Sequence, residues 1–180
     1  MNLSVKEKLK LTELTGSAHY VLEYGCGESS VILSRSKNLR KLVSVESDPE
    51  WAEKISQYGF NNHQVHYIEI NAKSGDWGEP QDSKFRDQWI LYPMQVFAEQ
   101  KLDVIFVDGR FRVACCATAY LKLEQSGLLI VHDYQRNEYH TIEEFFNIEG
   151  ICEQLAWFKK KPEKEAEALR CFCDHAYITF

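Results

Sequence analysis

The sequence has no apolar run of the length that a membrane-spanning helix requires. Its first ten residues are polar and lysine-rich, and no apolar stretch follows them, so we expect no signal peptide, no membrane partner and a cytoplasmic location. Internal repeats, low-complexity tracts and Pro- or Ser-rich linkers are also absent. The 180 residues are therefore predicted to form a single domain, residues 1–180, around one hydrophobic core.

Positive charge and metal-binding cysteine patterns are scarce as well. The formal net charge is −6, whereas a nucleic-acid surface is normally basic, so we predict no nucleic-acid partner. The one positive run, residues 159–161, is followed by a proline and several glutamates and is interpreted as a solvated loop. The 6 cysteines include no Cys-x-x-Cys pair, so we expect reduced thiols and no structural zinc.

Helix and strand signals alternate along the chain. A capping box at Ser4 and Glu7 begins a helix that ends near Gly16, and Asp48-Pro49 begins another that runs to Gln57. Further helices are expected at residues 29–37, near 93, at 111–123 and at 137–146. Strands are expected at residues 20–24, 41–46, 65–70, 102–107 and 128–131, with two more in the tail 151–180. This alternation predicts an α/β fold with a parallel sheet and right-handed crossovers.

A glycine-rich turn, EYGCGESS at residues 23–30, follows the first predicted strand. Gly25 and Gly27 permit a tight turn and a close approach of the backbone to a ligand. Glu46 ends the next strand, where a carboxylate can accept hydrogen bonds from both hydroxyls of an adenosine ribose. The pattern therefore predicts an adenosine-containing ligand.

A dinucleotide suits this turn poorly. Ser30 stands where a dinucleotide site needs a third glycine or an alanine. Glu28 would place a negative charge beside a diphosphate at a helix N-terminus. The same glutamate is acceptable beside a cationic sulfonium that carries an ammonium group. An NAD(P)-dependent oxidoreductase is therefore the less favoured alternative.

The segments VLEYGCG (21–27) and VSVESD (43–48) resemble the first and second motifs of class I S-adenosylmethionine-dependent methyltransferases. The resemblance implies a Rossmann-like, doubly wound, mostly parallel seven-stranded sheet with helices on both faces. It also implies that Glu23, Gly25 and Gly27 surround the methionine part of the cofactor, that Glu46 holds the ribose, and that Asn71 or its neighbours border the adenine. Cys26 and Asp108 are assigned to the same cofactor site.

Polar residues end the fourth and fifth strands, at Asp108 and at His132-Asp133, and are predicted to be catalytic because neighbouring parallel strands end at one crevice. In one mechanism Asp108 and Asp133 hold Mg²⁺, which resembles the metal-dependent O-methyltransferases of catechols and macrolide sugars. In another, His132 is a metal-free general base on a hydroxyl. In a third interpretation, Asp108 only satisfies turn amides and His132 is a hydrogen-bonded strand end.

The acceptor pocket is expected under the long loop 71–92. Trp77 and Tyr92 are predicted to roof it, Tyr134 is assigned to the same pocket, and Arg110 and Arg112 are predicted to clamp an acidic substrate. Because little chain precedes the first strand, we expect an open pocket or one completed by a second subunit of a homo-oligomer.

The sequence as a whole predicts a methyltransferase that acts on an oxygen of a small molecule, a sugar or a phenol. The alternative is a non-catalytic methyltransferase-like module that binds a partner or regulates one.

Overall fold

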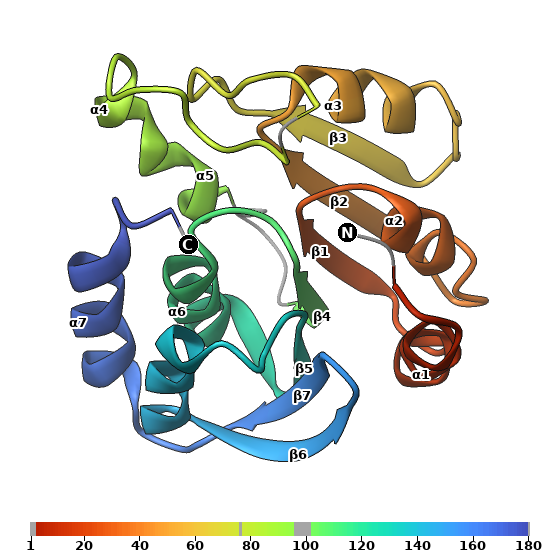
Figure 1. Cartoon of the computed structure of the whole chain (residues 1–180). Coiled ribbons are helices and arrows are strands. Elements are labelled where there is room, and N and C mark those ends of the chain that lie inside the picture. The colour runs from red at the N-terminus through yellow and green to blue at the C-terminus, as the bar shows by residue number, and fades with distance from the viewer. Residues whose placement is uncertain (1–2, 76, 96–101, 180) are drawn as a thin grey trace.

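The computed structural model describes residues 3–75, 77–95 and 102–179. A 7-stranded sheet with the order β3-β2-β1-β4-β5-β7-β6 runs through its centre (Figure 1). The strands β1 to β5 pair in parallel, β7 is antiparallel to β5, and β6 is antiparallel to β7. The predicted fold class, a mostly parallel doubly wound sheet, is confirmed. The strand order reverses between β1 and β4, which is where such sheets bind ligands.

The strands are β1 (Tyr20–Tyr24), β2 (Lys41–Glu46), β3 (His63–Tyr67), β4 (Leu102–Val107), β5 (Leu123–Val131), β6 (Phe146–Cys152) and β7 (Leu155–Lys160). The helices are α1 (Val5–Thr15), α2 (Glu28–Leu33), α3 (Pro49–Ser56), α4 (Arg86–Trp89), α5 (Leu91–Met94), α6 (Arg112–Lys122), the 3-10 helix η1 (Asn137–Glu144) and α7 (Glu165–His175).

Helices cover both faces of the sheet, as expected (Figure 1). On one face α1 and α2 bury a cluster that includes Leu11, Leu33 and Phe106. On the other face α5, α6, α7 and η1 enclose a larger cluster around Tyr92 and Phe111. None of the described helices is long and apolar enough to cross a membrane. All 6 cysteines are free, in agreement with the expected thiols.

Local signals placed several elements correctly. The capping box of α1 is present, and the Asp48 side chain accepts bonds from two amides at the start of α3, with Pro49 in the first turn. Three expectations are wrong in detail: α2 ends at Leu33, β3 spans His63–Tyr67, and β5 begins at Leu123.

The tail differs most from the prediction. Residues 165–175 form α7, where a strand was expected, because the sequence there was interpreted by its charge. Glu165 and Glu167 lie in the first turn of this helix, where acidic side chains favour the helix dipole. Its buried residues Ala168 and Cys171 belong to the larger cluster, so α7 covers the sheet face beside α6.

The loops after β1 and β4 meet at two glycines. Gly25 has a φ of 88°, and a Cβ there would lie 2.6 Å from the Cα of Gly109. A Cβ on Gly109 would lie 2.0 Å from the hydroxyl oxygen of Tyr92 and 2.8 Å from the amide nitrogen of Gly25. Tyr92 is fully buried and its hydroxyl donates to the carbonyl of Val45, so it has no room to move. Both positions therefore require glycine.

We predict that Gly109→Ala lowers the free energy of unfolding by about 1–3 kcal/mol, because the new methyl group overpacks the loop contact. Urea denaturation measures the change. Gly27→Ala is the matched control, since its φ of 172° is extended and, beyond its chain neighbours, none of the residues that the structure describes has an atom within 4 Å of the added Cβ. Equal stability of the two variants would contradict the described loop contact.

Candidate active site

A cavity of about 260 Å³ opens at the carboxyl ends of the central parallel strands. Its position at the reversal of the strand order agrees with the crevice expected from the sequence. The lining residues follow four strands: Gly25, Cys26 and Gly27 after β1, Glu46 and Ser47 at the end of β2, Asp108, Gly109 and Arg110 after β4, and Asp133, Arg136 and Tyr139 after β5, together with Leu3, Glu28, Ser29, Trp51, Trp77 and Arg112.

Glu46 is fixed at the cavity wall by three backbone amides. Its Oε2 accepts from the amide of Cys26 at 2.8 Å, and its Oε1 accepts from the amides of Ser47 and Asp48 at 2.6 and 2.8 Å. Burial raises the pKa of its carboxyl, and the three amides act in the opposite direction. The carboxylate oxygens retain lone pairs, so Glu46 is positioned to accept further bonds from a ligand in the cavity.

One wall offers open space and aromatic surface. Apart from the two chain neighbours of Gly27, no described residue has an atom within 4 Å of the position that a Cβ would take there, so the space belongs to the cavity. The indoles of Trp51 and Trp77 line the same cavity, and the Lys54 ammonium lies 4.3 Å from the centre of the Trp51 ring. This wall can hold a flat ring beside Glu46.

Glu23 is not a cavity residue, contrary to the expectation that it contacts the cofactor. It is fully buried, and its carboxylate accepts from the hydroxyls of Ser29 at 2.5 Å, Ser30 at 2.6 Å, and Ser44. Burial raises its pKa to about 7. Ser29 and Ser30 lie in the first turn of α2. The structure uses them to hold Glu23 beneath the glycine turn, so this glutamate shapes the turn from below.

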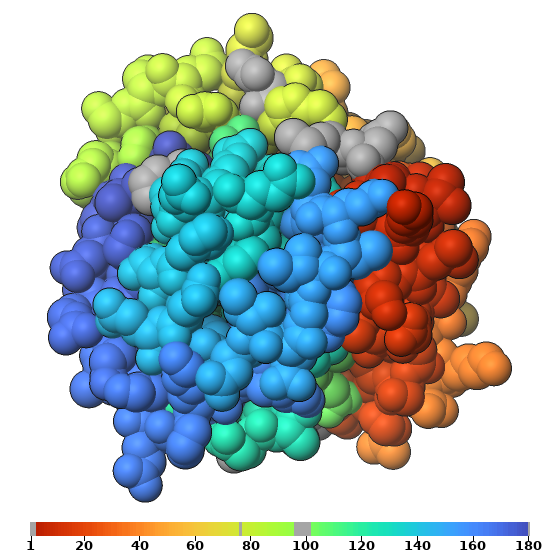
Figure 2. Space-filling model, turned by 60° about the horizontal axis from the view of Figure 1, so that its bottom comes forward, coloured from red at the N-terminus to blue at the C-terminus, as the bar shows by residue number. Residues whose placement is uncertain are grey.

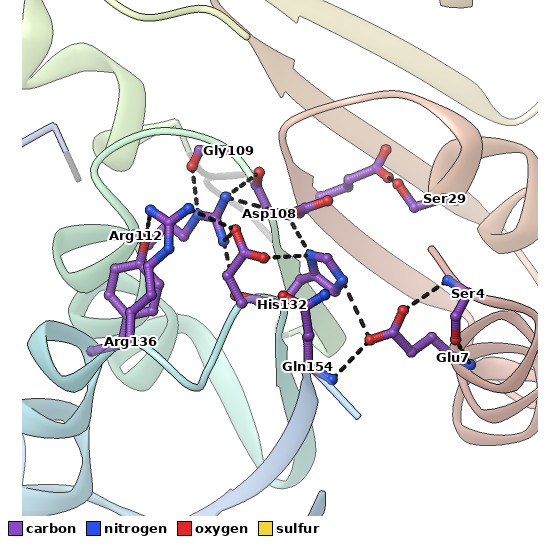
Figure 3. Close-up of polar contacts among 12 residues, drawn as sticks. Ser4, Glu7, Ser29, Asp108, Gly109, Arg112, His132, Arg136 and Gln154 are labelled. Carbon is purple, nitrogen blue, oxygen red and sulfur yellow. Dashed lines mark hydrogen bonds and ion pairs between the residues drawn. The ribbon is translucent and has the colours of Figure 1, made fainter. Parts of the chain in front are cut away.

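Six charged side chains of alternating sign form a continuous row from α1 to the cavity, and we call this set the charged row (Figure 3). In order they are Glu7, His132, Asp108, Arg112, Asp133 and Arg136. The row begins where α1 lies against the β6–β7 turn (Figure 2). There Glu7 accepts from the amide of Gln154 at 2.9 Å.

His132 lies beneath the cavity and does not line it. Its Nδ1 is 3.1 Å from Oδ1 of Asp108, and its Nε2 is 3.5 Å from Oε1 of Glu7. Burial acts to lower the pKa of His132, but the hydrogen bond to Asp108 and the surrounding carboxylates outweigh it and raise the pKa. The neighbouring carboxylates therefore favour the protonated form of the buried imidazole. The expectation that His132 takes a proton directly from a substrate is wrong, because its side chain points away from the cavity toward α1.

Arg112 makes four hydrogen bonds within the protein, and its remaining N–H group faces the carboxylate of Asp108 in an ion pair. Nε donates to the carbonyl of Gly109 at 2.9 Å, and Nη1 donates to the carbonyl of His132 at 2.8 Å and to Oδ2 of Asp133 at 3.0 Å. Nη2 donates to the carbonyl of Asp108 at 3.1 Å and lies 3.3 Å from Oδ1 of the same residue. With no donor left, Arg112 does not fit the predicted role of a substrate clamp.

The expected magnesium site does not fit the side chains present. Asp108, His132 and Asp133 each offer one ligand atom, and these atoms lie within 4.8 Å of one another. Both carboxylates are already paired with the guanidinium of Arg112, and Nδ1 of His132 is taken up by Oδ1 of Asp108 at 3.1 Å. The positive charge that a divalent ion would bring is supplied here by the protein.

Three predicted ligand contacts lie outside the cavity. The side-chain amide of Asn71 donates to Asp82 at 2.8 Å, so this residue braces its own loop. Tyr92 is buried under Gly109, and Tyr134 is buried with its hydroxyl donating to Glu143 at 2.7 Å. Both tyrosines pack in the apolar core, although we had predicted from the sequence that they line the acceptor pocket.

Other predicted residues do line the cavity, and some lining residues were missed. Trp77 and Arg110 face it together, since Nε of Arg110 donates to the carbonyl of Trp77 at 3.0 Å. Arg136, Tyr139 and Leu3 were not predicted. The position of Arg136 just after β5 was the one signal that could have identified it.

We predict that Glu23→Gln flattens the dependence of stability on pH. The folded-state pKa of about 7 exceeds the ordinary glutamate pKa of 4.5, so the wild type holds this proton when folded and loses stability as pH rises from 4.5 through 7. The loss is on the order of 3 kcal/mol. Urea denaturation from pH 5 to 8 measures it, with the exposed-site variant Glu13→Gln as control. Equal slopes for both variants and the wild type would contradict the buried titration.

Comparison with known proteins supports the fold. No protein-family model and no curated protein sequence matches the chain. Among solved structures, a methyltransferase-like protein from Silicibacter pomeroyi matches with a TM-score of 0.79 and 27% identity over 96% of each chain. The match therefore spans nearly the whole of both proteins.

More distant structures share the fold alone. The N-methyltransferase NodS from Bradyrhizobium japonicum, in complex with S-adenosylhomocysteine, matches with a TM-score of 0.57 and 15% identity, over 87% of this chain and 84% of that one. The 23S rRNA methyltransferase ErmE matches with a TM-score of 0.54 and 14% identity, over 95% and 75%. The resemblance of the two motifs is thus matched by the sheet and by its structural neighbours, and the chain belongs to the class I superfamily of S-adenosylmethionine-dependent methyltransferases.

Proposed function

We propose that this protein methylates a hydroxyl oxygen of a small molecule without a metal ion. The observation that carries the proposal is the state of Asp108, which lines the cavity. Its Oδ1 is engaged by His132 and Arg112, while its Oδ2 has no hydrogen-bond partner among the described residues. A carboxylate held in this way presents one free acceptor atom to a hydroxyl in the cavity.

The cavity residues fit S-adenosylmethionine. Glu46 offers a fixed carboxylate for the ribose hydroxyls, the Gly27 turn leaves open space, and Trp51 and Trp77 offer ring surface for an adenine. When bound, this cofactor supplies a methyl group on a positively charged sulfur. Anchoring its two ends fixes the direction from which an acceptor oxygen must approach, and much of the rate comes from that alignment.

Asp108 holds the proton that the hydroxyl loses. Burial raises the pKa of its carboxyl, but the hydrogen bond to His132 and the charge of Arg112 outweigh burial and lower the pKa. The carboxylate is therefore ionised and ready to accept at neutral pH, and it is a weak base. A weak base suits a phenol, whose pKa is about 10, better than the far less acidic hydroxyl of a sugar. We therefore favour a phenol as the acceptor.

The dimensions of the site favour a small acceptor. The cavity measures about 260 Å³ and has acidic and basic side chains on its walls. The chain carries a net charge of −6, which opposes binding of a polyanion. Nucleic acid is therefore not proposed as the substrate.

We predict that S-adenosylhomocysteine binds the wild type and that Gly27→Ala and Glu46→Gln each weaken it about 10- to 100-fold. The alanine fills ligand space, and the glutamine removes charge-assisted hydrogen bonds. Isothermal titration calorimetry measures both, with NAD⁺ titrated in parallel and circular dichroism to confirm folding. If the wild type binds neither ligand, the proposal is wrong. If it binds NAD⁺ in preference to S-adenosylhomocysteine, the cofactor is a nicotinamide dinucleotide.

We predict that Asp108→Asn lowers kcat for methylation of a phenol about 100-fold or more while S-adenosylhomocysteine affinity changes little, because the amide cannot take the proton. Wild type and variant are assayed on a panel of phenols and sugars with and without a chelator of divalent cations. Loss of activity in chelator would contradict the metal-free mechanism. Equal kcat values would remove Asp108 from it.

A further inference from the structure

The charged row ends in the cavity with a cation whose charge is incompletely matched. Arg136 contacts Oδ2 of Asp133 at 3.3 Å, but Arg112 contacts the same oxygen atom at 3.0 Å. One carboxylate is thus shared by two guanidinium groups. Because Arg112 is buried and closer, Asp133 chiefly neutralises Arg112, and Arg136 is left with excess positive charge at the cavity wall.

Arg136 also has unused donors, in contrast to Arg112. Besides its contact with Asp133, Arg136 donates from Nη1 to the hydroxyl oxygen of Tyr139 at 3.4 Å. The described part of the chain therefore offers partners to two of its five N–H groups. Its side chain is 42% exposed, and its guanidinium lies 5.9 Å from the centre of the buried Tyr139 ring. That ring lies beside the guanidinium, and Arg136 lines the cavity with N–H donors that have no partner among the described residues.

Arg110, the other partly exposed arginine of the cavity, is differently placed. Its Nε donates to the carbonyl of Trp77, and its Nη1 lies 3.5 Å from Glu79, an acid for which no second cation competes in the described structure. The charge of Arg110 is therefore matched within its own loop contact. Of these two arginines, Arg136 is therefore the one whose positive charge is less completely matched.

We propose that Arg136 binds a carboxylate of the acceptor, so that the substrate is a small hydroxylated carboxylic acid. A guanidinium with two free parallel N–H donors matches a carboxylate in geometry as well as charge. One end of the acceptor then meets Arg136 and its hydroxyl meets Oδ2 of Asp108, since both residues line the cavity. A bound monoanion next to Arg136 would add one further negative charge to the alternating charges of the charged row. The proposal rests on the function proposed above and specifies its substrate class.

The experiment compares acids with their neutral amides. Protein saturated with S-adenosylhomocysteine is titrated calorimetrically with 2-, 3- and 4-hydroxybenzoate and with the three matching hydroxybenzamides. We expect at least one acid to bind 10-fold or more tightly than its amide. Arg136→Gln should reduce that ratio to about one, Arg136→Lys should retain part of it, and the control Arg110→Gln should leave it unchanged.

Three results would overturn the assignment. No acid preference in the wild type would exclude an anion subsite, and an equal loss in Arg110→Gln would show that general charge, not Arg136, attracts the acid. If Arg136→Gln weakens S-adenosylhomocysteine itself, Arg136 holds the carboxylate of the cofactor instead. Failure of the wild type to bind S-adenosylhomocysteine overturns the proposed function, and the substrate assignment with it. Normal binding without acid preference overturns the substrate assignment alone.

Discussion

The geometry of the cavity depends on one buried guanidinium. Arg112 binds the carbonyls that end β4 and β5 and the two carboxylates that follow them, so it fixes both strand ends at once. A lysine could not replace it, because an ammonium has three donors and no planar fork. Asp133 even adopts a φ of 58°, which is costly for a residue other than glycine and is sustained by its two arginine partners. Asp108 keeps its free oxygen in the cavity only while this arrangement holds.

Buried charges are tolerated here because each has neighbours of opposite sign. Removing a charge from water is costly, and an unpaired partner left behind costs several kcal/mol, so the charged row acts as a unit. Glu7 ties α1 into it: the same carboxylate caps its own helix through the amide of Ser4, accepts from the β6–β7 turn and faces His132. The first helix and the last hairpin are thereby joined beneath the cavity.

The sequence predicted what short-range patterns determine. The limits of β4, the start of α3 at Asp48-Pro49 and the position of Glu46 all follow from local signals, and the structure agrees with each. Partners chosen by tertiary packing could not be predicted. Glu23 was assigned to the cofactor, yet three serine hydroxyls draw it under the turn. The sequence shows that position 112 is an arginine, but it does not show that five acceptor atoms from two strand ends surround this side chain.

The tail and the acceptor side show the same division. Residues 159–167 are rich in lysine and glutamate and look like a solvated loop, but Lys159 and Lys160 end β7, and α7 begins at Glu165 and packs against α6. Tyr92 and Tyr134 carry polar tips that suit a ligand, but their rings fill the core. Whether a side chain is exposed to the cavity and can contact a ligand depends on how the helices and the sheet pack together.

The aromatic wall gives the protein a built-in optical reporter. Of its 4 tryptophans, Trp51 and Trp77 line the cavity, while Trp89 and Trp157 lie elsewhere. Indole emission shifts and dims when water at the ring is replaced by a stacked base or a nearby positive charge. Ligand binding in the cavity should therefore change the intrinsic fluorescence of the unlabelled protein. The single variants Trp51→Phe and Trp77→Phe identify which indole is responsible for the change.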